Sequence, residues 1–295
     1  MPNPFSFLAP RSGIALVIAS LALPALAQSG STPPPDGDWD VLRDPRRKLT
    51  IVSTAFDNGL GIALRCNDRS YEALLTGLPV APAGETRPLR LAFRDNPLFD
   101  YTWSVATDPT VAVSGFPAPF ARSVRQGGRL QIVVPNGAGD GRNLRYDLTL
   151  PVSGAAIDET LTACGRPLVD PRDAEIADIG ASGLPGDMIW RRAPRPTFPT
   201  RTRYARGFAV VSCMSNPDGS LRDCVVETEH PQGGYFGEAA LRSTGAARLK
   251  MTADEDAAVA ARQVAFRVGF ALRGYNPAPQ TRSRIRPSES READE

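Results

Sequence analysis

Four cysteines and one histidine are the residues whose types and spacing could carry specific chemistry. The cysteines are Cys66, Cys164, Cys213 and Cys224, and the histidine is His230. A zinc site needs four Cys or His ligands, usually with close C-x2-C pairs, and a thioredoxin-like redox site needs C-x-x-C. Neither spacing occurs in the chain. Disulfides are therefore the favoured chemistry, provided that the chain is exported to an oxidising compartment.

The N-terminal segment predicts that export. Arg11 precedes an apolar run over residues 13–23, and the sequence ALA at 25–27 offers the small residues of a signal-peptidase site. The run is shorter than the roughly 20 residues that span a bilayer. We predict a signal peptide over residues 1–27, cleaved to give a periplasmic protein. An uncleaved, inner-membrane-anchored N-terminus is the alternative.

Composition and missing motifs argue against several classes of function. The formal net charge is +2 over 295 residues, which gives no general attraction to nucleic acid or to an anionic membrane. No P-loop, dinucleotide fingerprint or G-x-S-x-G motif is present. His230 precedes Pro-Gln-Gly-Gly and is predicted as an exposed loop residue, although a hydrolase would have to use it as its base. We expect no enzyme, no catalytic residue and no cofactor.

An acidic cluster is the remaining candidate for a metal. Asp254, Glu255 and Asp256 are consecutive but lack the ligand spacing of a calcium loop. A solvated loop is the favoured interpretation, and we expect no metal site.

A first folded unit is expected over residues 39–166, after a Pro/Gly/Ser linker at 28–38. Short β-branched runs between turn signals predict an antiparallel, β-sandwich-like domain. The strand candidates are 49–56, 61–66, 87–94, 101–107, 129–135 and 144–151, with a short helix at 117–126.

A closing helix is expected at the end of this unit, with Ser153 as its N-cap and Gly165 as its stop. Ile157, Leu161 and Cys164 share one face of it. Because Cys66 ends a strand, a Cys66–Cys164 disulfide would fix this helix to the sheet.

A second folded unit is expected over residues 188–275, between a linker at 167–187 and a disordered polar tail at 276–295. Two strands flank an Asn-Pro-Asp-Gly turn, and a four- or two-residue loop would place Cys213 directly opposite Cys224. A three-residue loop would put the two cysteines on opposite faces. The pair therefore predicts both a disulfide and a register.

The end of this unit predicts a short helix at 235–243 and a strand at 263–273, giving a small α+β fold. The strand alternates, with Val264, Phe266, Val268, Phe270 and Leu272 on the core face. Gln263, Arg267 and Arg273 lie on the polar face.

These residues resemble a known family. The pattern Trp190…Pro194…Phe198-Pro199…Gly207-x-Ala-Val-x-x-Cys213…Asp218-Gly219…Cys224-x-Val226…Phe236-Gly237-x-Ala239-Ala240-Leu241…Phe266-Arg267-Val268 is similar to the C-terminal domain of TonB energy transducers. The resemblance covers residues 188–273. It implies that an extended peptide, such as the TonB box of outer-membrane receptors, pairs with the last strand. On this basis Gln263, Arg267 and Arg273 are the predicted partner-binding residues.

A sparser pattern gives the first unit a second resemblance. Asp38-Trp39-Asp40-Val41, Cys66, Phe93-Arg94-Asp95, Trp103-Ser104-Val105-x-Thr107-Asp108 and Cys164 resemble VasI and invasion-associated locus B proteins over residues 37–166. These families imply a secreted, non-catalytic accessory role.

Three functions follow, in decreasing order. The first is a non-enzymatic periplasmic binding or adaptor protein that takes a protein or peptide partner by β-augmentation in envelope transport. The second is a secretion-system or virulence accessory protein, and the third is a periplasmic hydrolase.

Overall fold

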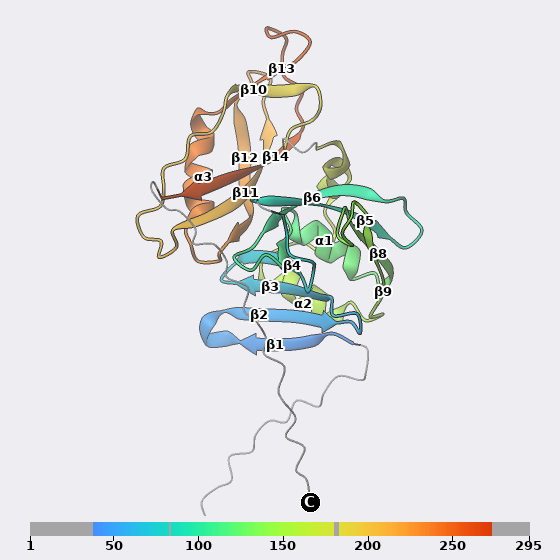
Figure 1. Cartoon of the computed structure of the whole chain (residues 1–295). Coiled ribbons are helices and arrows are strands. Elements are labelled where there is room, and N and C mark those ends of the chain that lie inside the picture. Colours follow the sequence, from blue (N-terminus) through green and yellow to red (C-terminus); the bar gives the residue numbers. More distant parts are fainter. Residues whose placement is uncertain (1–37, 83, 180–182, 273–295) are drawn as a thin grey trace, which may run out of the picture. The chain divides into compact units, whose positions relative to one another are not determined.

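Antiparallel pairing organises the chain from its first described residues. The computed structural model describes residues 38–82, 84–179 and 183–272, so the predicted leader, most of the first linker, Arg273 and the predicted tail lie outside the described residues. The first part forms a nine-stranded antiparallel sheet (Figure 1). Its strands, in sheet order, are β1 (Asp40–Asp44), β2 (Leu49–Ala55), β3 (Gly61–Asn67), β4 (Ser70–Thr76), β7 (Ala112–Val113), β6 (Phe99–Val105), β5 (Thr86–Phe93), β8 (Gly128–Val134) and β9 (Leu144–Leu150).

The six strands predicted by alternation in this part are confirmed, and three more are found. β1, β4 and β7 escape the pattern because each is short or interrupted by charge. In β4 the residue that breaks the apolar pattern is Glu72, which is fully buried. The prediction of a β-rich, antiparallel fold is correct.

Two helices cover the apolar face of the nine-stranded sheet. Helix α1 (Pro117–Val124) packs the ring of Phe120 against Trp103, with ring centroids 5.3 Å apart. Helix α2 (Ala155–Ala163) buries Ile157 and Leu161, as the sequence predicts. Its N-cap is Gly154 and not the predicted Ser153, and it has no side-chain cap. A Cβ on Gly154 would lie 2.7 Å from the carbonyl oxygen of Arg125, so close packing decides this position.

The second part is built on a three-stranded antiparallel sheet with the order β12 (Leu221–His230), β11 (Arg206–Ser215), β14 (Gln263–Ala271). Helix α3 (Phe236–Ser243) packs on β11 and β12. A separate pair, β10 (Met188–Arg192) and β13 (Arg248–Met251), adds the ring of Trp190 to this core, 5.0 Å from that of Phe266. The interpretation of Trp190 as a packing anchor is therefore confirmed. Three short 3-10 helices complete the described elements: η1 (Pro45–Arg47), η2 (Pro171–Asp178) and η3 (Thr244–Ala246).

The β11–β12 hairpin reaches the predicted cysteine register by an unexpected route. Next to the turn Met214 pairs with Arg222, which is the register of a loop with an odd number of residues. A bulge at Asp223, whose φ is 50°, then inserts one residue and shifts the ladder to Ser212↔Val225. The predicted loop length is therefore wrong, whereas the juxtaposition of the two cysteines is right.

The three-stranded sheet is buried on both faces. Its core face packs against α3, as predicted, except that Leu272 is 49 % exposed and does not belong to that face. On the other face Phe208 and Val210 form a small apolar cluster with Ala106 and Val113 of the nine-stranded part. All described residues belong to one compact unit, and the predicted domain boundaries stay a prediction.

Candidate functional site

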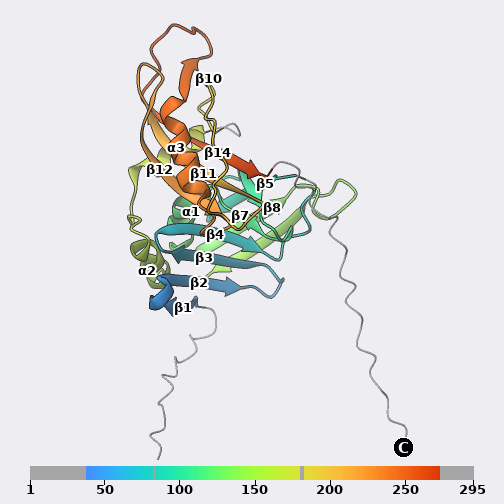
Figure 2. The same cartoon turned by 90° about the vertical axis from the view of Figure 1, so that its left-hand side faces the viewer.

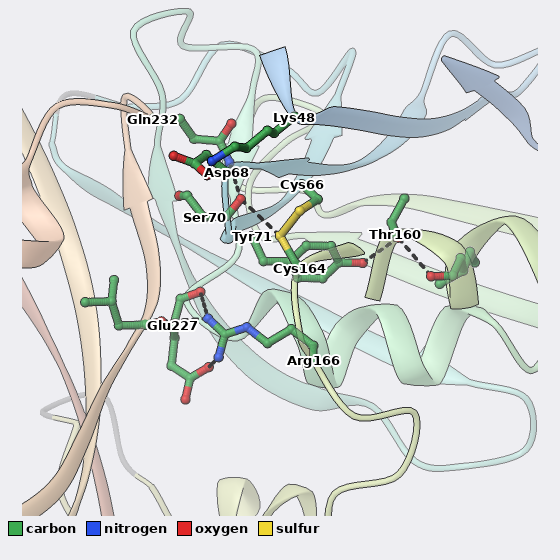
Figure 3. Close-up of a disulfide and its surroundings, with 12 residues drawn as sticks. Lys48, Cys66, Asp68, Ser70, Tyr71, Thr160, Cys164, Arg166, Glu227 and Gln232 are labelled. Carbon is green, nitrogen blue, oxygen red and sulfur yellow. Dashed lines mark hydrogen bonds and ion pairs between the residues drawn. A yellow bond between two sulfur atoms is a disulfide. The ribbon is translucent and has the colours of Figure 1, made fainter. Parts of the chain in front are cut away.

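The cysteines form the two predicted disulfides. Cys66 at the end of β3 is bonded to Cys164, the C-cap of α2, and Cys213 in β11 is bonded to Cys224 in β12. Beside the first bond, the hydroxyls of Tyr71 and Thr160 are 3.0 Å apart and join β4 to α2 (Figure 3). All four thiols are consumed, so cysteine is available neither as a nucleophile nor as a metal ligand.

His230 is not the exposed loop residue that the sequence predicts. It ends β12, its side chain is 16 % exposed, and its Nδ1 lies 2.7 Å from Oε1 of Glu72 in β4. The second oxygen of Glu72, which is 0 % exposed, accepts a hydrogen bond from Arg65. His230 therefore bridges the two sheets. Its partner lies 158 residues away in the sequence, so local pattern could not reveal it.

Further polar contacts cross the same junction. Gln232 Nε2 donates to the carbonyl of Ser70 at 2.9 Å, and Arg166 donates to the carbonyl of Val226 at 2.7 Å. Figure 3 shows Arg166 and Glu227 facing each other beside the Cys66–Cys164 bond, with the Arg166 Nη1 to Glu227 Oε2 distance at 3.7 Å. The residues with the most specific chemistry thus have structural partners, and their arrangement joins two sheets.

A second buried carboxylate, Glu229, supports the start of α3. Its two oxygens accept from the backbone N–H groups of Gly233 (2.9 Å) and Gly237 (2.8 Å). A carboxylate placed at the positive end of a helix is stabilised there. Like Glu72, it holds the fold in place.

The predicted acidic cluster forms local contacts only. Lys250 pairs with Glu255 and lowers the pKa of that carboxyl by hydrogen bonding. In the part of the chain that the structure describes, no group of three or more Cys, His, Asp or Glu residues is placed to hold a metal ion.

The predicted partner-binding side chains on β14 are engaged within the chain. Gln263 is 5 % exposed, and its backbone N–H donates to Glu175 at 3.1 Å. Arg267 donates to Ser104 Oγ at 3.1 Å and to the Glu85 carboxylate at 2.7 Å. Alternation distinguishes two faces of a strand but not which of them meets water, and here the polar face packs on the first part of the chain. Partner binding by these side chains stays a prediction, and Arg273 lies outside the described residues.

The backbone of β14 offers a different kind of site. Leu272 N–H donates to Ala205 O on the β11 side, and Ala265 N–H donates to Gly183 O on the opposite side. Even-numbered residues of β14 therefore pair with β11, and odd-numbered residues face the outer edge. Within residues 38–82, 84–179 and 183–272, no acceptor bonds the outward N–H groups of Arg267, Gly269 and Ala271. This stretch is an open strand edge, which can template pairing with another chain.

No described helix is both long and apolar enough to cross a membrane.

Comparison with known proteins gives little beyond this geometry. No family model and no curated protein matches the chain, so no comparison supports the TonB resemblance. Among solved structures, the crystal structure of invasion associated protein B from Bartonella henselae is similar at 15 % identity, with a TM-score of 0.34. The match covers 43 % of this chain and 93 % of that one. A TM-score this low does not establish a common fold, and no argument about this chain rests on it.

Proposed function

We propose that this chain is a non-catalytic, exported binding protein that adds an extended peptide of an envelope partner to the outer edge of β14. The observation that carries the proposal is the run of three outward N–H groups at Arg267, Gly269 and Ala271 that lack acceptors among the described residues. Main-chain hydrogen bonds to such an edge supply affinity in β-augmentation. The two disulfides support an oxidising compartment such as the periplasm.

The structure narrows where the peptide would bind. The outward N–H groups of Gln263 and Ala265 are already bonded to Glu175 and Gly183. The free edge is therefore the C-terminal half of β14, from Arg267 to Ala271. The engaged side chains of Gln263 and Arg267 would contribute less than the backbone.

The test uses a proline that blocks the edge. Ala271 is exposed and its N–H faces outward, so Ala271→Pro removes an edge donor without removing a bond to β11. Ala271→Ser keeps the donor and is the matched control. We expect pools of acetylated, amidated heptapeptides to slow amide exchange at Arg267, Gly269 and Ala271. The proline should weaken binding about tenfold, equivalent to one or two lost hydrogen bonds.

Equal binding by the proline and serine variants would contradict the proposal, as would protection of another surface with none at these three amides. Loss of native near-ultraviolet circular dichroism in Ala271→Pro would be checked first; amide exchange of the wild-type chain then decides alone. Neither the predicted secretion-system role nor the predicted hydrolase role is favoured by a specific observation in the structure.

A further inference from the structure

Strand β6 is paired along only part of its second edge. β7 consists of Ala112 and Val113, and it meets β6 at Ser104 and Val105 alone. Val105 N–H donates to Glu85 O on the β5 side, so odd-numbered residues of β6 bond β5. Asp100 therefore turns its backbone N–H and C=O toward the other edge, at a level where β7 has ended. No described strand pairs with β6 there.

An apolar trough lies beside this open edge. After Val113 the chain diverges from β6 and enters α1, and two pockets of ≈ 140 Å³ and ≈ 150 Å³ lie in the gap. Both are lined by Phe99, Tyr101, Phe116 and Ile176, so they form one trough. The first pocket is closed by aromatic side chains, whose other members are Phe93, Trp103 and Phe120. The second runs along Asp100.

The mouth of the trough is accessible and its wall is poor in water. Phe99 is 37 % exposed, and its ring centroid lies 4.9 Å from that of Tyr101 in an edge-to-face contact. Burial raises the pKa of the Tyr101 hydroxyl. A dry apolar cavity of about 150 Å³ holds a benzene-sized group. Each pocket therefore matches one large apolar side chain, such as Phe or Leu.

The charges around the trough exclude a charged occupant. Arg122 holds Asp173 with two hydrogen bonds, and Glu85 holds Arg267 at 2.7 Å. Asp100, whose side chain is 82 % exposed, has Arg90 at 3.3 Å. Each charged group at the rim thus has an opposite partner, and an added charge would find no counter-ion.

The same balance makes the chain's own C-terminal segment a poor occupant. Residues 281–286 read TRSRIR, with three arginines around a single isoleucine. Desolvating those charges against an apolar wall is unfavourable.

We propose that this trough is a second peptide-binding site, in which an uncharged extended segment of another protein pairs with β6 at Asp100 and inserts a Phe or Leu side chain into the aromatic pocket. Backbone pairing sets the orientation, and the pocket sets the specificity. The site is distinct from the outer edge of β14 and does not depend on binding there.

The probe is a set of acetylated, amidated heptapeptide pools with a fixed central residue and uncharged residues elsewhere. The oxidised chain should bind the Phe and Leu pools at least tenfold more tightly than the Gly, Lys and Asp pools in fluorescence anisotropy. Amide exchange at Asp100 should slow when the Phe pool is bound. Ala271→Pro should leave this binding unchanged, which separates it from binding at β14.

Two pairs of variants locate the site. Asp100→Pro removes the outward donor, and Asp100→Asn keeps it. Ser123→Leu fills the first pocket from α1, and Ser123→Ala leaves it open; Ser123 lines that pocket. We expect the proline and leucine variants to lose the preference for the Phe pool and the two controls to keep it. If one variant does not fold, the other pair tests the site alone.

Several outcomes would overturn the proposal. The pools could bind without regard to the central residue, or bind equally to Asp100→Pro and Ser123→Leu. Binding of free indole with no binding of any peptide would make the occupant a small aromatic molecule. Much tighter binding after removal of residues 276–295 would make it the chain's own tail. Concentration-dependent dimerisation that Ser123→Leu abolishes would make it a second copy of the chain.

Discussion

Each part of the molecule contains one disulfide, but the two bonds constrain it differently. Cys66–Cys164 closes a sequence separation of 98 residues and fixes the end of α2 to β3. Cys213–Cys224 spans 11 residues and joins two strands that are already neighbours in a ladder. The first bond sets the position of a helix, whereas the second repeats a constraint that backbone pairing already imposes. The same chemistry therefore serves tertiary structure in one part and local structure in the other.

The largest expected effect comes from removing these bonds in turn. On chain-entropy grounds, the Cys66→Ala/Cys164→Ala double variant should lower the free energy of unfolding by about 4.7 kcal/mol, and Cys213→Ala/Cys224→Ala by about 2.8 kcal/mol. Urea unfolding under non-reducing conditions measures both. A hairpin variant that loses more stability than the long-range variant would show that the comparison is wrong.

A smaller effect should come from the junction between the two sheets. His230→Ala removes the partner of Oε1 of Glu72, a carboxylate with no exposed surface, and leaves that atom unsatisfied. We expect a loss of about 2 kcal/mol in the free energy of unfolding, the usual cost of an orphaned buried polar group. His230→Gln can still donate and should lose less. If alanine and glutamine cost the same, the Glu72 contact does not stabilise the junction.

Local patterns predicted the parts of the fold that depend on neighbouring residues. Alternation located β2, β3, β5 and β14, and helical spacing placed Cys164 on the buried face of α2. Cysteine pairing also followed, because each pair lies within one packed part. The loop length of the hairpin did not follow, since the bulge at Asp223 compensates for it.

The candidate site was less predictable, because it depends on contacts between distant segments. Nothing near His230 in the sequence points to Glu72, and nothing in β14 says that Arg267 will lie over the ring of Phe208, 4.6 Å from its centroid. The open edge of β6 arises from the brevity of β7, two residues that carry no strand pattern of their own.

The smallest expected effect concerns acid and the segment that connects the two parts. Asp170, the N-cap of η2, accepts from the backbone N–H of Arg172 at 3.1 Å and from its guanidinium at 2.7 Å. These bonds, led by the one from the guanidinium, lower the pKa of the Asp170 carboxyl. A carboxyl with a lowered pKa in the folded state adds stability above its unfolded pKa, about 3.9, and that stability is lost as the pH falls below this value. Asp170→Asn should therefore flatten the decline of the urea midpoint between pH 5 and pH 3, within about that window. Asp147→Asn is the matched control: Arg129 also lowers the pKa of Asp147, but both side chains are half exposed, and solvent screens their pairing. A larger flattening with Asp147→Asn than with Asp170→Asn would mean that acid acts on the surface of the nine-stranded sheet and not on the connection between the parts.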